Sequence, residues 1–188
     1  MNLFQLILLG ASAYMAYKIY EHIQTLQDPE RQNTPPPRVD KSASELIEEA
    51  DMAFEEEDFS RAKALLAEAD VKEPNNAQTL GKLAYILAKE GETERAIEHY
   101  THSLEIEEDD MVHNALASLY REEKEYDAAK EHYEKALRID SKYDVTYYNY
   151  GNLLQDMENI DEAKKMYQKA LDINPDFSQA QEELEKIS

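Results

Sequence analysis

The chain has 188 residues, enough for one modest domain with additional segments, and its hydrophobic fraction of 42% is ordinary for a globular protein. Its 41 acidic and 20 basic residues give a net charge of −21, which repels the phosphate backbone of DNA and RNA. No nucleic-acid partner is therefore expected. The sequence contains no cysteine, which excludes disulfides, thiolate zinc sites and cysteine nucleophiles.

Residues 3–20 form an apolar segment whose single charge, Lys18, lies near its end. As a helix this segment would span about 27 Å, close to the roughly 30 Å hydrocarbon core of a bilayer. We interpret residues 1–23 as a single-pass membrane anchor, and its small residues leave self-association open. A cleaved signal peptide is the alternative, because "ASA" at 11–13 resembles a cleavage site. The apolar run before it is short, however, and no basic residue precedes it.

Residues 24–42 change in composition, with Pro29 and the run from Pro35 to Pro37 in a polar context. Consecutive prolines favour a stiff polyproline II conformation and prevent a continuous helix. This segment is therefore predicted to be a linker that separates the anchor from the following domain.

Basic residues lie at the C-terminal end of the apolar segment and after it, and none precedes it. They are Lys18, Arg31, Arg38 and Lys41. Because positive charge is enriched on the cytoplasmic side of a membrane span, residues 43–188 are predicted to face the cytoplasm. The periplasmic or another exoplasmic side is the alternative, since nearby acidic residues dilute this charge.

The remainder of the chain repeats itself. Residues 144–177, "DVTYYNYGNLLQDMENIDEAKKMYQKALDINPDF", align without a gap with residues 110–143, "DMVHNALASLYREEKEYDAAKEHYEKALRIDSKY". A third copy, one residue shorter, occupies 77–109, and a fourth occupies 43–76. Residues 178–188 follow the last copy and are expected to form a terminal capping helix.

Each copy contains two stretches with apolar residues spaced three and four apart, joined by a polar turn, which predicts a helix hairpin. Small residues recur where the two helices must approach each other. In the first helices they are Ala50, Ala84, Ala117 and Gly151, and in the second helices Ala62, Ala96, Ala129 and Ala163. Large side chains are expected to fill the space beside them at Leu66, Tyr100, Tyr133 and Tyr167.

This pattern of a large residue, Leu, Gly and Tyr, then Ala, an aromatic residue and a late Pro resembles the tetratricopeptide repeat (TPR). The resemblance covers residues 43–177. It implies an all-α fold, a right-handed superhelical array of about four hairpins plus the capping helix. It also implies protein binding without catalytic machinery, so neither an enzyme nor a cofactor or metal is expected. His99 and His102, three residues apart, are interpreted as surface residues and not as metal ligands.

Such arrays hold an extended peptide or a helix in a concave groove lined by the first helix of each hairpin. The residues that the repeat phase places there are Gln78, Tyr85, Met111, Asn114, Ser118, Arg121, Tyr148, Asn152 and Gln155. We expect Tyr148 and Asn152 to lie together with Asn114, where amides and a flat ring suit an extended peptide. The alternative is that these residues are solvated positions on a helix face.

Together these features predict a membrane-tethered protein–protein interaction module that acts as a scaffold, assembly factor or recruiter. The alternative is a receptor or chaperone-like holdase for translocating polypeptides at a membrane translocon. Residues 43–188 hold the whole net charge, because the four acidic and four basic residues of 1–42 cancel. This acidity favours basic or neutral ligands.

Overall fold

The computed structural model describes residues 14–15, 17–22 and 40–187. The chain divides into two compact units, residues 1–41 and 42–188. In the first unit, residues 14–15 and 17–22 are helical. No helix among the described residues is long and apolar enough to cross a membrane. Most of the predicted anchor and nearly all of the predicted linker lie outside the described residues.

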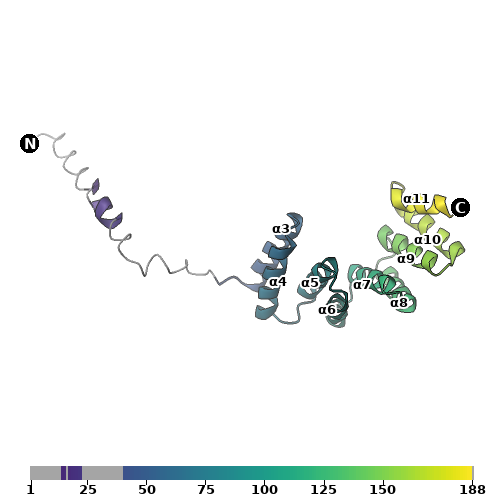
Figure 1. The fold of residues 1–188 in the computed structure, drawn as a ribbon, viewed down its shortest axis with the longest axis horizontal. Coiled ribbons are helices and arrows are strands. Elements are labelled where there is room, and N and C mark those ends of the chain that lie inside the picture. Colours follow the sequence, from purple (N-terminus) through teal and green to yellow (C-terminus); the bar gives the residue numbers. More distant parts are fainter. Residues whose placement is uncertain (1–13, 16, 23–39, 188) are drawn as a thin grey trace, which may run out of the picture. The chain divides into compact units, whose positions relative to one another are not determined.

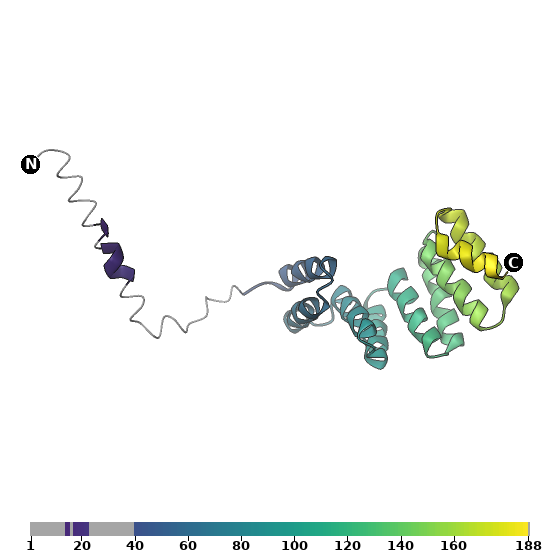
Figure 2. The ribbon, with the colours of Figure 1, turned by 45° about the horizontal axis from the view of Figure 1, so that its top comes forward.

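The second unit is built from helices alone in the part that the structure describes, which confirms the predicted all-helical array. Figures 1 and 2 show its helix pairs following one another along the chain. The helices are α3 (Ala43–Glu55), α4 (Phe59–Lys72), α5 (Ala77–Lys89), α6 (Thr93–Ile106), α7 (Asp110–Glu122), α8 (Tyr126–Ile139), α9 (Asp144–Asp156), α10 (Ile160–Ile173) and α11 (Ser178–Lys186).

The helices pack as four hairpins, α3 with α4, α5 with α6, α7 with α8, and α9 with α10, and α11 packs on α10. The first helices of neighbouring hairpins also touch, α5 with α7 and α7 with α9. Since each hairpin buries its apolar face against the next, the core runs through the unit as a series of linked clusters.

Polar side chains cap the start of several helices by accepting a hydrogen bond from a free backbone N–H of the first turn. The caps are Ser42, Asp58, Asn76 and Asp109. Ser42 forms a complete capping box, because the Glu45 carboxylate also accepts from the Ser42 backbone N–H at 2.8 Å. These interactions define where α3, α4, α5 and α7 begin.

The turn inside each hairpin contains one residue in the left-handed backbone region. These residues are Glu57, Gly91, Lys124 and Glu158, with φ between 57° and 78°. They occupy equivalent positions in the four copies. Only Gly91 is of the type that favours this conformation, so the helix packing on either side holds the other three in it.

The small residues predicted at the helix contacts are buried in all four hairpins. The side chains predicted to lie beside them, Leu66, Tyr100, Tyr133 and Tyr167, are at most 3% exposed. Tyr133 and Tyr150 stack with ring centroids 5.7 Å apart, which joins the third hairpin to the fourth. The repeated Ala and aromatic positions therefore form the core, as predicted.

Two histidines from different helices of the third hairpin meet inside the unit. His113 of α7 is 2% exposed, and its Nδ1 lies 2.8 Å from Nδ1 of His132 on α8. The other ring nitrogen of His113, Nε2, lies 2.5 Å from a carboxylate oxygen of Glu108. Burial and, to a smaller extent, the neighbouring His113 lower the pKa of His132 to about 4.

We expect this pair to make folding sensitive to mild acid. The pKa of His132 is about 4 in the folded state and near its ordinary value of 6.5 in the unfolded state, so the unfolded chain takes up the proton first. This contribution to stability is complete above pH 6.5 and is lost as the pH falls toward 4. The urea midpoint should therefore decrease between pH 7.5 and 5.5.

The variant His132→Asn removes the titrating ring and keeps a polar side chain beside His113. Its urea midpoint should change less over the same pH range, in which carboxylates remain ionised. An equal decrease in the variant and the wild type would assign the acid sensitivity to other groups.

Candidate functional site

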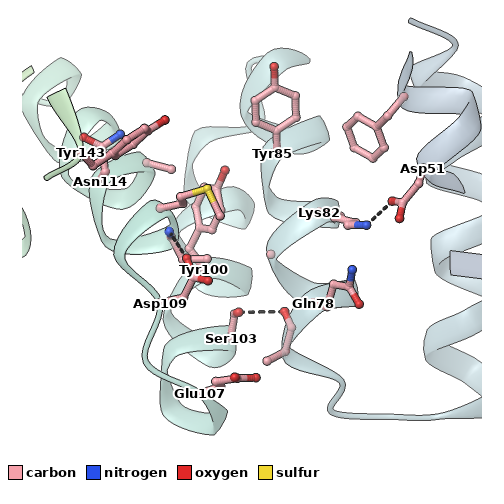
Figure 3. A pocket seen from close by; sticks show the side chains of 16 residues that line it. Asp51, Gln78, Lys82, Tyr85, Tyr100, Ser103, Glu107, Asp109, Asn114 and Tyr143 are labelled. Atoms are coloured by element: carbon pink, nitrogen blue, oxygen red, sulfur yellow. Dashed lines mark hydrogen bonds and ion pairs between the residues drawn. The ribbon is translucent and has the colours of Figure 1, made fainter. Parts of the chain in front are cut away.

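A hollow with a volume of about 810 Å³ lies along α5 and α7. Helices α3 and α6 also contribute side chains, and Tyr143 closes one end from the segment before α9. Figure 3 shows these side chains converging from the different helices. We call this space the α5–α7 hollow.

The base of the α5–α7 hollow is mostly apolar. Tyr100 is only 3% exposed, while Tyr85 and Met111 reach the surface at 40% and 59% exposure. Gly81 lies on the wall, where a Cβ atom would be 3.5 Å from Cγ2 of Val112, an ordinary contact. An apolar group of a ligand would therefore meet rings, a thioether and backbone.

Aromatic rings line the end of the hollow near α3. The ring centroids of Phe54 and Tyr85 lie 5.8 Å apart, and Phe59 lies 5.7 Å from Phe54. The ammonium of Lys89 lies 5.5 Å from the centroid of the Tyr85 ring, a cation–π distance. The Tyr85 face therefore already contacts a cation of this chain.

The charged groups of the hollow are mainly acidic. Lys82 of α5 forms an ion pair with Asp51 of α3. Asp109 accepts a hydrogen bond from the Val112 backbone N–H at 2.8 Å, and Glu107 adds a third carboxylate to the lining. With three carboxylates and one ammonium among its lining side chains, the hollow attracts positive charge.

A second, smaller hollow of about 230 Å³ lies at the C-terminal end of the unit, and we call it the C-terminal hollow. Arg121 and Asp156 form an ion pair across it at 2.6 Å. The Tyr148 ring packs at 5.0 Å from Phe177 and 6.0 Å from Tyr167, measured between centroids. Its polar groups are therefore largely used within the protein.

The nine predicted groove residues divide between the two hollows. Four lie in the α5–α7 hollow, namely Gln78, Tyr85, Met111 and Asn114. Four lie in the C-terminal hollow, namely Arg121, Tyr148, Asn152 and Gln155. Ser118 lies in neither, because its hydroxyl donates to the Asn114 carbonyl at 3.1 Å and lies 2.9 Å from the Tyr133 hydroxyl.

That Tyr148 and Asn152 lie together with Asn114 stays a prediction, and the three residues line two different hollows. The Asn114 side chain lies in the α5–α7 hollow and accepts a hydrogen bond from the Asn149 amide at 3.2 Å. Asn152 instead accepts from the Tyr167 hydroxyl at 2.8 Å. The side-chain amides of Asn114 and Asn152 therefore both have partners within the protein.

Several lining residues were not predicted from the sequence. Asp51 and Phe54 stand 34 residues before Tyr85 and Ala88, so the repeat phase itself could have identified them. Tyr143 comes from a turn and has no such signal. Tyr100 was predicted as a core residue and is buried, yet it also lines the hollow.

Comparison with known proteins agrees with the array of helix hairpins. A family model described as tetratricopeptide repeat matches residues 53–119 and 120–187. No curated protein sequence matches the chain.

Several solved structures share the fold. MamA from Desulfovibrio magneticus is 19% identical, with a TM-score of 0.69 over 77% of this chain and 82% of that one. PilF from Pseudomonas aeruginosa is 22% identical, with a TM-score of 0.71 over 77% and 67%. YrrB, described as a TPR protein with an unusual peptide-binding site, is 22% identical, with a TM-score of 0.65 over 74% and 73%. At such identities the likeness shows the fold alone.

Proposed function

Because this chain belongs to the tetratricopeptide repeat family, we propose that it is a membrane-tethered interaction module that holds an extended segment of a partner protein in the α5–α7 hollow. Repeats of this family are generally non-catalytic protein–protein interaction modules. Family membership accounts for protein binding in general, whereas the side chains of the hollow indicate which surface binds.

The observation that carries the proposal is the hollow of about 810 Å³ lined by exposed apolar groups and amides. Tyr85 is 40% exposed, whereas the other aromatic rings of this unit are buried more completely. Met111 is 59% exposed. Rigid rings bind at a small cost in conformational entropy, and the Gln78 and Asn114 amides are able to pair with a peptide backbone. In the C-terminal hollow, by contrast, comparable groups already pair with one another.

Tethering to a membrane is supported by the first unit. The described residues 14–15 and 17–22 expose their apolar side chains, among them Tyr14 at 63%, Met15 at 67% and Ile19 at 57%. Exposed apolar surface is unfavourable in water. Because residues 3–20 are apolar almost throughout, a lipid bilayer is the environment that we propose for them. The proline-rich, polar sequence of residues 24–42 suits a spacer between such an anchor and the repeats.

The test uses the full chain, which should sediment with membranes and be released by detergent. Partners captured from the extract are then titrated against the double variant Tyr85→Ala with Met111→Ala. We expect their binding to weaken by about 2 kcal/mol or more, roughly thirtyfold, because exposed aromatic and thioether groups in a hollow act as hot spots.

A matched control removes similar apolar surface elsewhere. Val71 and Ile139 are 81% and 47% exposed and do not line the hollow. The double variant Val71→Ala with Ile139→Ala should bind every partner at wild-type strength. If this control loses the partners while the hollow variant retains them, the interaction surface lies outside the α5–α7 hollow.

A further inference from the structure

One residue that lines the α5–α7 hollow has a buried ring and a hydroxyl that forms no hydrogen bond within the described part of the chain. The Tyr100 side chain is 3% exposed, and Figure 3 shows its hydroxyl pointing into the hollow. Within the part of the chain that the structure describes, no group forms a hydrogen bond with this hydroxyl. Burial raises the pKa of Tyr100, so the phenol stays neutral and both donates and accepts.

The equivalent tyrosines of the next two repeats are satisfied. The Tyr133 hydroxyl lies 2.9 Å from Oγ of Ser118. The Tyr167 hydroxyl lies 2.8 Å from both Oδ1 of Asn152 and Oε1 of Gln155, and donates its proton between them. The Tyr100 hydroxyl, which no described group pairs and which lines the hollow, departs from the pattern of these two tyrosines.

The reason lies in the neighbouring first helix. The position of Ser118 and Asn152 is occupied in the second repeat by Tyr85, whose hydroxyl extends away from Tyr100 (Figure 3). The position of Gln155 is occupied there by Ala88, which has no polar side chain. The second repeat therefore opens a space where the others place an internal acceptor, and a ligand is able to fill it.

The charge around this space selects the ligand. Glu107 lines the hollow, and its carboxylate pairs with no basic group in the portion of the chain described. Asp109 caps α7, and the only ammonium in the lining, that of Lys82, is already paired with Asp51. A positively charged ligand gains attraction here, whereas a negatively charged one is repelled.

We infer that the α5–α7 hollow recognises an extended, basic segment of a partner protein, in which arginine residues flank an apolar residue. This inference rests on the proposed function and specifies its ligand. The apolar side chain lies on Tyr85 and Met111, a polar group of the segment pairs with the Tyr100 hydroxyl, and an arginine pairs with Glu107. Arginine suits this site because its guanidinium is weakly hydrated, stacks on rings and binds carboxylates through two N–H groups.

The spacing follows from the geometry of an extended chain, in which alternate side chains face the same side. The probe is therefore the labelled peptide acetyl-Ser-Arg-Ser-Leu-Ser-Arg-Ser-amide, with arginine and leucine on one face. Two matched peptides replace both arginines by glutamine or by glutamate. Fluorescence anisotropy with the full chain in detergent should detect the arginine peptide, with binding at least tenfold weaker for the glutamine peptide and none for the glutamate peptide.

Three variants localise the binding. Tyr100→Phe keeps the ring and removes the hydroxyl, and should weaken the arginine peptide about five- to tenfold, as expected for one hydrogen bond. Glu107→Gln should weaken it several-fold and reduce its salt dependence. Glu98→Gln removes an exposed carboxylate of α6, the helix that Glu107 follows, and this carboxylate does not line the hollow, so the change should leave binding unaltered.

The inference is overturned if the arginine peptide does not bind, if the glutamine peptide binds equally well, or if Glu98→Gln weakens binding as much as Glu107→Gln. The last result would indicate general attraction to an acidic surface. None of these results removes the proposed function, because that depends on loss of natural partners in the Tyr85→Ala with Met111→Ala variant. Loss of those partners together with no preference for arginine would leave the groove in place and its ligand neutral.

Discussion

Replacing Gly151 by alanine is expected to lower the free energy of unfolding by about 1 to 3 kcal/mol, although alanine favours a helix by about 1 kcal/mol. A Cβ atom on Gly151 would lie 2.5 Å from Cε1 and 2.7 Å from Cδ1 of the Tyr167 ring. That ring is fully buried, and its hydroxyl bonds to Asn152 and Gln155 oppose any displacement. Leucine at this position should prevent α9 and α10 from pairing. Urea denaturation followed by circular dichroism measures both effects.

Gly81→Ala is the matched control, since this glycine is also within a first helix. Its added Cβ would lie 3.5 Å from Val112 and 3.6 Å from Ser103, both ordinary contacts. We expect unchanged stability or a gain of up to about 1 kcal/mol from helix propensity. Similar destabilisation by alanine at both glycines would mean that the Tyr167 contact is not what requires Gly151.

Replacing Tyr133 by alanine is expected to cost about 3 to 5 kcal/mol, the range for removing a large buried aromatic ring. The ring is fully buried in the cluster that joins the third and fourth hairpins, and it stacks on Tyr150 at 5.7 Å. Most of the cluster lies on helices that pack against other helices, so the cavity is expected to close only in part. The urea concentration at the midpoint of unfolding should therefore be much lower for Tyr133→Ala than for the wild type.

Phenylalanine at position 133 separates the contribution of the ring from that of the hydroxyl. Ser118 donates its own proton to the Asn114 carbonyl, so it accepts the Tyr133 proton and remains paired after that proton is lost. The cost of Tyr133→Phe should stay below about 1.5 kcal/mol. If phenylalanine costs as much as alanine, the hydrogen bond and not the packing of the ring stabilises this contact.

Tyr148 illustrates how far the repeat phase predicts a binding site. Its position on the first helix places it on the face that such arrays use for ligands. In the structure the ring contacts Phe177, which precedes α11, and Tyr167 of α10. In the last repeat this position is therefore used for packing, because the segment that leads into the capping helix lies against the Tyr148 ring.

The sequence by itself determined the repeat architecture. The apolar spacing predicts the helices, and the recurrence of small and aromatic residues every 33 or 34 positions predicts their packing. Both signals are local, because each hairpin contacts mainly its neighbours and every copy repeats the same contact. Residues such as Ala117 and Tyr133 are buried for this reason.

Only the tertiary structure decided which repeated positions remain available for other molecules. His113 meets His132, Lys82 pairs with Asp51, and Ser118 is taken by Tyr133, and each pairing joins different helices. A helical period places a residue on a face but does not indicate which polar group on the facing helix will reach it. The Tyr100 hydroxyl forms no hydrogen bond among the described residues for the same reason. The partners of the equivalent tyrosines lie on the first helix of the hairpin, where the second repeat has Tyr85 and Ala88.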